Sequence, residues 1–346
     1  LVEYLYSLEC LVALLGDPGN ADRLERIAFN ALPATFSPDM WAHQYDQQLN
    51  QVECSVRDNR TWSTNGPDAN IFGVEPHYGC CTANLSQGWP KFAAHLWMRT
   101  AEGGLAAAAY APSRLETEVR GVRVSVDLET EYPFREELVF RVSVGRPVSF
   151  PLLLRIPAWA EGACVRIGGD EPATPTAGSF HRIEREWSGE TRLVLTLPMR
   201  PEVLERPRGA VSVARGPLLY ALPIAEEWRR VHEDDPLRAL PHGDWEVFPA
   251  GPWNYALSGS GRRLEQALRF EEHPLSEIVF HPGHPPVSAR VVGRAVPSWR
   301  EENGSAAPTP AGPITVDTPA EALRLIPYGC TNLRIAEFPV CRRTER

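Results

Sequence analysis

The sequence lacks several features that would mark it as a membrane or nucleic-acid protein. No apolar run in its 346 residues approaches the ~20 residues that a membrane-spanning helix needs. Basic residues are not in excess either, because the formal net charge is −9. No basic stripe is visible that could neutralise nucleic-acid phosphates. We therefore expect no membrane and no nucleic acid among its partners.

Cysteine is scarce and follows no disulfide framework. The seven cysteines are an odd number without framework spacing, which fits a reducing compartment better than a disulfide-rich secreted domain. No signal peptide is visible, so we expect a cytoplasmic protein. The chain opens at Leu1, without an initiator methionine and already in helical rhythm. We therefore expect an N-terminally truncated fragment.

The first ~100 residues have the periodicity of helices joined by a long loop. Apolar residues at positions 1, 5, 8, 12 and 15 form one face of a helix that should end at Gly16. A second helix should begin with Asn20 as its cap and end before Pro33. Residues 38–79 lose this periodicity. The tryptophan, asparagine and glutamine side chains of this segment are compatible with two interpretations. It could be an ordered, sugar-binding surface, or an irregular loop with only a structural role.

A third helix should begin after residue 79, with Thr82 as its cap. Its apolar positions 85, 89, 92 and 96 are spaced by four, three and four residues. Pro90 lies inside this pattern, so it should kink the helix or divide it into two short pieces.

Beyond residue 100 the periodicity changes to two. Alternating apolar residues predict strands over 122–128, 138–144 and 193–197, and residues 150–160 read as a buried strand. Short, regularly spaced strands are typical of an antiparallel β-sandwich, here at about 101–200. Residues 209–222 predict two strands around the Gly216–Pro217 turn, which opens a second β domain. Within that domain we expect the charged segment 226–245 to be a surface insertion and residues 302–313 to form a flexible loop.

Two adjacent cysteines, Cys80 and Cys81, lie in the stretch "HYGCCTANLSQGW". Neighbouring cysteines rarely form a disulfide with each other, because the ring would be strained. Both thiolates could bind one zinc ion, or one could be a nucleophile whose pKa is lowered by the metal or by a helix N-terminus. Two inert buried thiols, or a zinc-free redox-active Cys80, are the alternatives. Further ligand candidates nearby are Glu53, Cys54, Glu75 and His77.

Several ordered segments together resemble glycoside hydrolase family 127, the β-L-arabinofuranosidase-like family first described as a domain of unknown function. They are "LVEYLYSLECLVALLGD", "ADRLERIAFNALPA", "HYGCCTANLSQGWPKFAAHLWM", "GAVSVARGPLLYAL", "WNYAL" and "LRLIPYGCTNLRIAEFP". The resemblance implies an α+β multidomain fold. Residues 1–100 would be the C-terminal part of an (α/α)6-barrel catalytic domain, followed by a middle β-sandwich domain at 101–200 and a C-terminal β-sandwich domain at 201–346.

The resemblance also implies roles for particular residues. Cys80 corresponds to the family's nucleophile and zinc ligand, Cys81 to a second zinc ligand, and Tyr45 to a tyrosine that contacts the sugar. The family's other zinc ligands, a Glu-x-Cys motif, and its glutamate acid/base would lie before Leu1. The sequence reads "CCTAN" where the family commonly has "CCPPN", which leaves both thiols in place but alters the local turn.

The leading hypothesis is thus a retaining glycoside hydrolase with Zn²⁺ as cofactor. Its substrate would be an oligosaccharide or glycoside with a terminal L-arabinofuranose or related sugar, and the fragment alone should be inactive. A homodimer through the C-terminal domain is a further expectation. The alternative hypothesis is a non-catalytic carbohydrate-binding or structural β-sandwich protein, for which the ten tryptophans offer stacking surfaces.

Overall fold

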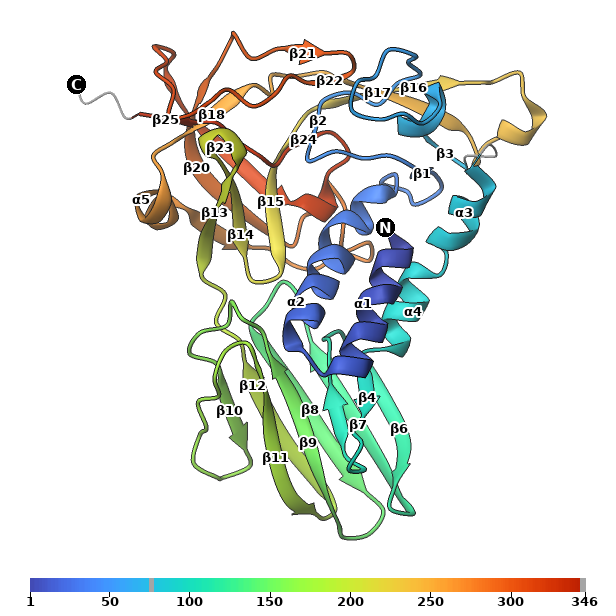
Figure 1. Ribbon diagram of the computed structural model, residues 1–346, viewed down its shortest axis with the longest axis vertical. Helices are drawn as coiled ribbons and strands as arrows, with labels where there is room; N and C mark the ends of the chain where they lie inside the picture. The colour runs from blue at the N-terminus through green and yellow to red at the C-terminus, as the bar shows by residue number, and fades with distance from the viewer. Residues whose placement is uncertain (75–77, 343–346) are drawn as a thin grey trace. The chain divides into compact units, whose positions relative to one another are not determined.

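The protein has an α+β fold in which sheets predominate, as the sequence predicted (Figure 1). The computed structural model describes residues 1–74 and 78–342. They form two units, each built from two stretches of chain. Unit 1 comprises Leu1–Phe29 with Ser86–Arg200, and unit 2 comprises Asn30–Leu85 with Pro201–Arg346. The division into three domains at residues 100 and 200 stays a prediction.

Unit 1 begins with two helices whose ends are set by specific residues. Helix α1 (Val2–Leu15) ends as predicted at Gly16, which has a φ of 65° and donates its N–H to the Val12 carbonyl at 2.9 Å. Helix α2 (Pro18–Arg26) starts earlier than predicted. Asp17, not Asn20, is its cap, because the Asp17 carboxylate accepts the Gly19 N–H at 2.9 Å. A π-helical stretch, Ile27–Ala31, follows α2.

The predicted alternation in residues 101–200 gives the strands of unit 1. Its five-stranded sheet has the order β10 (Cys164–Ile167), β12 (Glu190–Thr196), β8 (Glu137–Val144), β7 (Val122–Thr130) and β6 (Ser113–Val119). Its four-stranded sheet has the order β11 (Ser179–Trp187), β9 (Val148–Ile156), β5 (Leu105–Ala107) and β4 (Trp97–Arg99). The two sheets meet where Trp97 packs edge-on against Phe140, with ring centres 6.1 Å apart.

Unit 2 contains the largest sheet of the described residues. Its ten strands are β13 (Pro201–Arg206), β14 (Ala210–Arg215), β15 (Leu218–Pro223), β23 (Ala320–Pro327), β20 (Val287–Ala295), β18 (Tyr255–Ser258), β25 (Val340–Cys341), β19 (Arg269–Glu272), β2 (Asn50–Gln51) and β24 (Arg334–Ile335). The predicted turn at Gly216–Pro217 joins β14 to β15. Helix α5 (Gly261–Ala267) also belongs to this unit, and the segment predicted as a flexible loop includes part of a small hairpin, β21 (Glu301–Glu302) and β22 (Ser305–Ala306).

The charged segment at 226–245 is more regular than the predicted surface insertion. Its ends belong to β16 (Glu226–Val231) and β17 (Asp244–Pro249), which pair antiparallel along their whole length. They join β1 (His43–Gln44) and β3 (Phe72–Gly73) in a four-stranded sheet. Trp228 packs against Phe72 of the long loop, with ring centres 5.2 Å apart. The prediction missed these strands because their polar faces dominate the composition.

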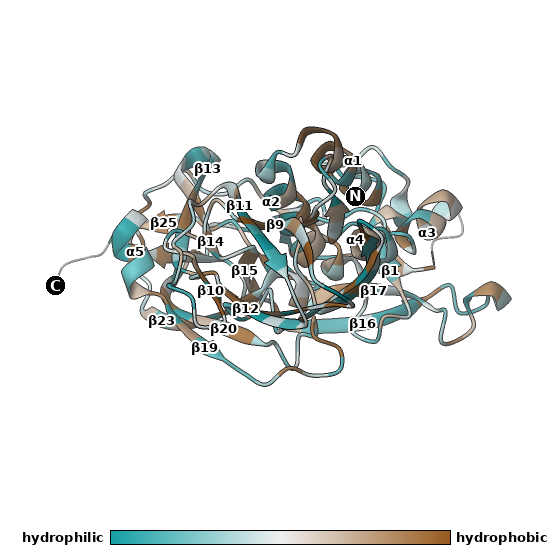
Figure 2. Ribbon diagram, turned by 90° about the horizontal axis from the view of Figure 1, so that it is seen from below, coloured by the Kyte–Doolittle hydropathy of each residue, from teal (hydrophilic) through white to brown (hydrophobic). Residues whose placement is uncertain are grey.

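Hydropathy differs strongly between elements (Figure 2). Helix α1 is largely hydrophobic, whereas β16 is largely hydrophilic. Some apolar side chains of α1 are exposed, Leu14 most of all at 80%. Among the residues that the structure describes, no helix combines the length and apolar character needed to cross a membrane.

Candidate functional site around the cysteine pair

The cysteine pair lies in the first turn of α3 (Gly79–Leu85), a helix of unit 2. The two Sγ atoms are 3.5 Å apart. Cys80 is exposed and Cys81 is half-buried, and all seven cysteines are free thiols. Cys80 is therefore not buried, whereas the chemical roles predicted for the two thiols stay predictions.

Thr82 anchors α3 but does not cap it, so the predicted cap is wrong. The helix begins at Gly79, three positions earlier. The Thr82 hydroxyl instead donates to the Val74 carbonyl at 2.7 Å and lies 3.2 Å from His43 Nε2. Burial lowers the pKa of the His43 imidazole. A neutral His43 imidazole can form a hydrogen bond with the Thr82 hydroxyl, and it adds no positive charge near the cysteine thiols. The separate helix α4 (Gly88–Ala94) confirms the predicted division into two pieces.

Tyr45 lies close to Cys81, and its predicted contact with the sugar stays a prediction. The negative charge that Cys81 carries as a thiolate raises the pKa of the Tyr45 phenol, with further contributions from burial and from a hydrogen bond to Cys81. The phenol is therefore a protonated donor beside the pair. Its ring stacks on Tyr78, with centres 4.3 Å apart and planes 16° apart. Sequence reasoning gave Tyr78 no role, although it stands only two positions before Cys80.

The other ligand candidates do not complete a metal site in the described residues. Within residues 1–74 and 78–342, no group of three or more histidine, cysteine or acidic side chains is placed to hold a metal ion. Cys54 is buried, accepts a hydrogen bond from Gln44 Nε2 at 3.0 Å, and has its thiol pKa raised by that burial. Glu53 forms an ion pair with Arg57 at 2.8 Å. Glu75 and His77 lie outside the described residues.

The two cysteines nevertheless suit half of a zinc site. Zinc–thiolate bonds are about 2.3 Å long and tetrahedral, so two thiolates on one zinc lie about 3.8 Å apart. The 3.5 Å between the Cys80 and Cys81 sulfurs is close to that spacing. This pair would supply two of the four ligands that zinc usually takes.

Buried amides order the long loop that carries Tyr45. Gln44 donates to the Asn70 carbonyl at 2.6 Å, and Gln51 donates to Gln44 Oε1 at 3.0 Å. Asn70 in turn donates to the Asp46 carbonyl at 3.0 Å. All three amides are buried. Asn70 Oδ1 has no hydrogen-bond partner among the described residues. The other hydrogen bonds of these amides still tie the loop to itself, so Tyr45 is presented by an ordered segment.

Comparison with known proteins places this site in context. Residues 104–199 match the family model described as "Beta-L-arabinofuranosidase, GH127 middle domain". No curated protein gives a significant match to the chain. A solved GH127 beta-L-arabinofuranosidase from Geobacillus stearothermophilus T6 has 22% identity and a TM-score of 0.66, over 99% of this chain and 49% of that one.

Two further solved structures give the same result. One, described as a glycoside hydrolase, has 17% identity and a TM-score of 0.66, over 98% of this chain and 51% of its own. The other, a GH127 beta-arabinofuranosidase, has 17% identity and a TM-score of 0.65, over 98% and 49%. The chain thus spans about half the length of these relatives. It shares their fold, and the match of residues 104–199 to the GH127 middle domain confirms its resemblance to glycoside hydrolase family 127.

Proposed function

We propose that the protein is a retaining glycoside hydrolase that removes a terminal L-arabinofuranose or a related sugar, with Cys80 as the nucleophile. The observation that carries the proposal is the exposed Cys80 thiol, 3.5 Å from the Cys81 sulfur. The nearby Tyr45 phenol and the family resemblance support it. Because the chain spans about half the length of the solved relatives, the proposal concerns the full-length protein.

The proposed reaction is a double displacement. The Cys80 thiolate attacks the anomeric carbon, a C–S bond forms as the glycosidic C–O bond breaks, and the departing oxygen takes a proton from an acid. By the family resemblance this acid is a glutamate. Water then adds to the same carbon and gives up a proton to the conjugate base, and the Cys80 thiolate leaves. Two inversions at one carbon retain its configuration.

Each residue of the site has a part in this scheme. Cys80 needs to be a thiolate at neutral pH, and a thiolate is also the form that leaves well in the second step. Cys81 would hold a zinc ion together with Cys80, and such an ion keeps bound thiols deprotonated. Tyr45 would donate a hydrogen bond from its phenol at the edge of the sugar site. Its stack on Tyr78 would fix the direction of that donor.

The test is hydrolysis of an aryl β-L-arabinofuranoside by the full-length protein. Cys80→Ser should lower kcat by at least about 10³-fold, because the nucleophile is lost. Cys164→Ser, at a half-buried cysteine in β10, is the matched control and should leave kcat unchanged. NMR of the first-formed sugar should show retained anomeric configuration. Equal activity of Cys80→Ser and the wild type would refute the proposal.

Metal analysis separates this proposal from a non-catalytic carbohydrate-binding protein. The full-length protein should retain zinc through gel filtration, and Cys81→Ala should lose it. Cys54→Ala is the control, because Cys54 is buried against Gln44 rather than placed with the pair. A protein that binds sugars but holds no zinc and has no turnover would favour the binding module.

A further inference from the structure

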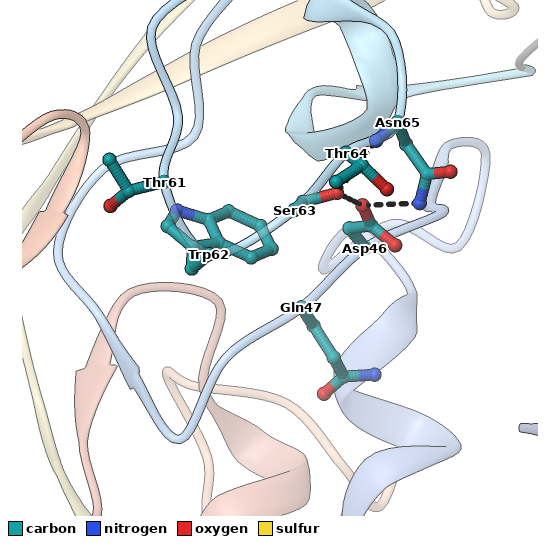
Figure 3. A pocket seen from close by; sticks show the side chains of 7 residues that line it. All are labelled: Asp46, Gln47, Thr61, Trp62, Ser63, Thr64 and Asn65. Carbon is teal, nitrogen blue, oxygen red and sulfur yellow. Dashed lines mark hydrogen bonds between the residues drawn. The ribbon is translucent and has the colours of Figure 1, made fainter.

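A hollow in unit 2 is lined by polar side chains around one tryptophan (Figure 3). Its volume is about 460 Å³. The residues that line it are Asp46, Gln47, Thr61, Trp62, Ser63, Thr64 and Asn65. All of them come from the long loop at 38–79. The sequence signal was the run "TWSTN", in which small polar residues surround a tryptophan.

Asp46 is the centre of the polar wall. Its Oδ2 accepts a hydrogen bond from Ser63 Oγ at 2.5 Å and another from Asn65 Nδ2 at 2.9 Å (Figure 3). Its other oxygen, Oδ1, accepts no hydrogen bond from any residue that the structure describes. The two donors fix the carboxylate and leave one charged acceptor for a ligand hydroxyl. Such an acceptor repels phosphates and carboxylates, so it favours polar ligands that carry no negative charge.

Trp62 forms the apolar wall and is held in place. With the Gln48 amide in the orientation that satisfies both of its ends, the amide oxygen accepts the Trp62 Nε1–H at 2.6 Å. The Arg60 guanidinium lies over the indole, 5.8 Å from the ring centre. The side chain is half-buried. A fixed, partly exposed indole is a ready surface for stacking.

The floor of the hollow is rigid. Gln47 donates to the Ala31 carbonyl at 2.9 Å and to Thr35 Oγ1 at 3.0 Å. Its amide oxygen accepts the Tyr328 hydroxyl at 3.0 Å. Buried Arg334 lies over the Tyr328 ring at 4.2 Å. Because every polar end of Gln47 is engaged, a ligand would meet a preorganised surface and lose little affinity to ordering it.

We propose that this hollow is a carbohydrate-binding subsite that holds one sugar ring. A sugar has an apolar C–H face, which suits Trp62, and hydroxyls at its rim, which suit Asp46 and Asn65. Purely apolar ligands would leave these polar groups unpaired, and anions would meet the Asp46 charge. Asp46 follows Tyr45 directly in the chain. Resting on the proposed function, we infer that this subsite binds a sugar other than the one bonded to Cys80, so that the substrate is an oligosaccharide.

Calorimetric titration of the full-length protein tests the subsite. The probes are an L-arabinofuranosyl disaccharide and methyl L-arabinofuranoside, and Cys80→Ser is used throughout to prevent turnover. The disaccharide should bind more tightly than the methyl glycoside. Trp62→Ala should weaken disaccharide binding about tenfold or more, the effect expected from losing a stacking surface. Asp46→Asn should also weaken it, because the charged acceptor is lost.

Two further variants keep this test decisive. Trp62→Phe retains an aromatic face and should keep most of the affinity, which separates loss of stacking from collapse of the loop. Trp41→Ala removes an exposed tryptophan of the same loop that does not line the hollow, and should leave binding unchanged. Equal binding of the two probes, or equal losses in Trp62→Ala and Trp41→Ala, would overturn the subsite. Because binding is read without turnover, such a result is distinct from a failure of the Cys80 mechanism.

Discussion

The buried ion pair of unit 1 makes a sharp prediction about stability. The Arg155 side chain is fully buried in β9, and its guanidinium lies 2.5 Å from the Glu25 carboxylate of α2. It also pairs with Asp22 and donates Nε–H to the Ala108 carbonyl at 2.6 Å. Burial raises the pKa of Glu25, and the Arg155 charge opposes that rise. The ion pair therefore links α2 to strand β9 within unit 1.

Arg155→Met should destabilise unit 1 by about 3–5 kcal/mol, because it leaves the Glu25 charge buried without its partner. In the wild type, Tyr110 N–H and Tyr132 O–H each donate to one oxygen of the Glu25 carboxylate. Glu25→Gln removes the charge but keeps one amide oxygen, which can accept one of these two hydrogen bonds. The double variant removes both charges and should be less destabilised than the sum of the single variants by about 1–3 kcal/mol.

Urea unfolding followed by far-UV circular dichroism measures these differences, and hydrogen exchange of α2 and β9 peptides assigns them to unit 1. Arg141→Met is the matched control, since it breaks a solvent-exposed pair with Glu129 and should change stability little. Strict additivity of the two buried substitutions, or an Arg155→Met effect no larger than that of Arg141→Met, would refute the reasoning.

Two other substitutions test burial and close packing. Burial raises the pKa of Glu9, whose carboxylate lies 2.9 Å from His95 Nδ1. The stabilising contribution of Glu9 is therefore present below the usual pKa of a glutamate and is lost as the pH rises above it, so Glu9→Gln should gain stability relative to the wild type as the pH is raised in urea titrations; a relative loss would contradict this sign. Gly104→Ala would place a Cβ atom 2.3 Å from the Pro151 carbonyl oxygen and should cost about 1–3 kcal/mol in the same assay. Gly169→Ala, where no heavy atom lies within 4 Å, should cost much less, and equal costs would contradict the packing argument.

Sequence periodicity predicted unit 1 well because its strands have one buried and one exposed face. The alternation over 122–128 lies inside β7, and that over 138–144 lies inside β8. It failed at 226–245, where charged residues hid the strand pairing with the long loop. The cap of α2 was missed because two nearby residues, Asp17 and Asn20, can both cap a helix and only the backbone decides between them.

The candidate site was predictable in part. Cys80 and Cys81 share a short motif, and Tyr45 was placed by family resemblance; the structure brings Tyr45 to Cys81. The roles of Tyr78 and His43 were not predictable. Their contacts form only when the loop at 38–79 folds back onto α3. The hollow around Trp62 forms because residues 61–65 fold back beside Asp46 and Gln47, and the run "TWSTN" does not by itself predict that contact.

The central claim, that Cys80 is the nucleophile, is tested most directly by trapping its covalent intermediate. The full-length protein is mixed with an activated aryl β-L-arabinofuranoside, quenched in acid within the first turnover, and digested for peptide mass spectrometry. We predict an added mass of one pentosyl unit on Cys80 and none on Cys81. Turnover with the pentosyl unit on a carboxylate, or with no covalent adduct at any time point, would contradict the account.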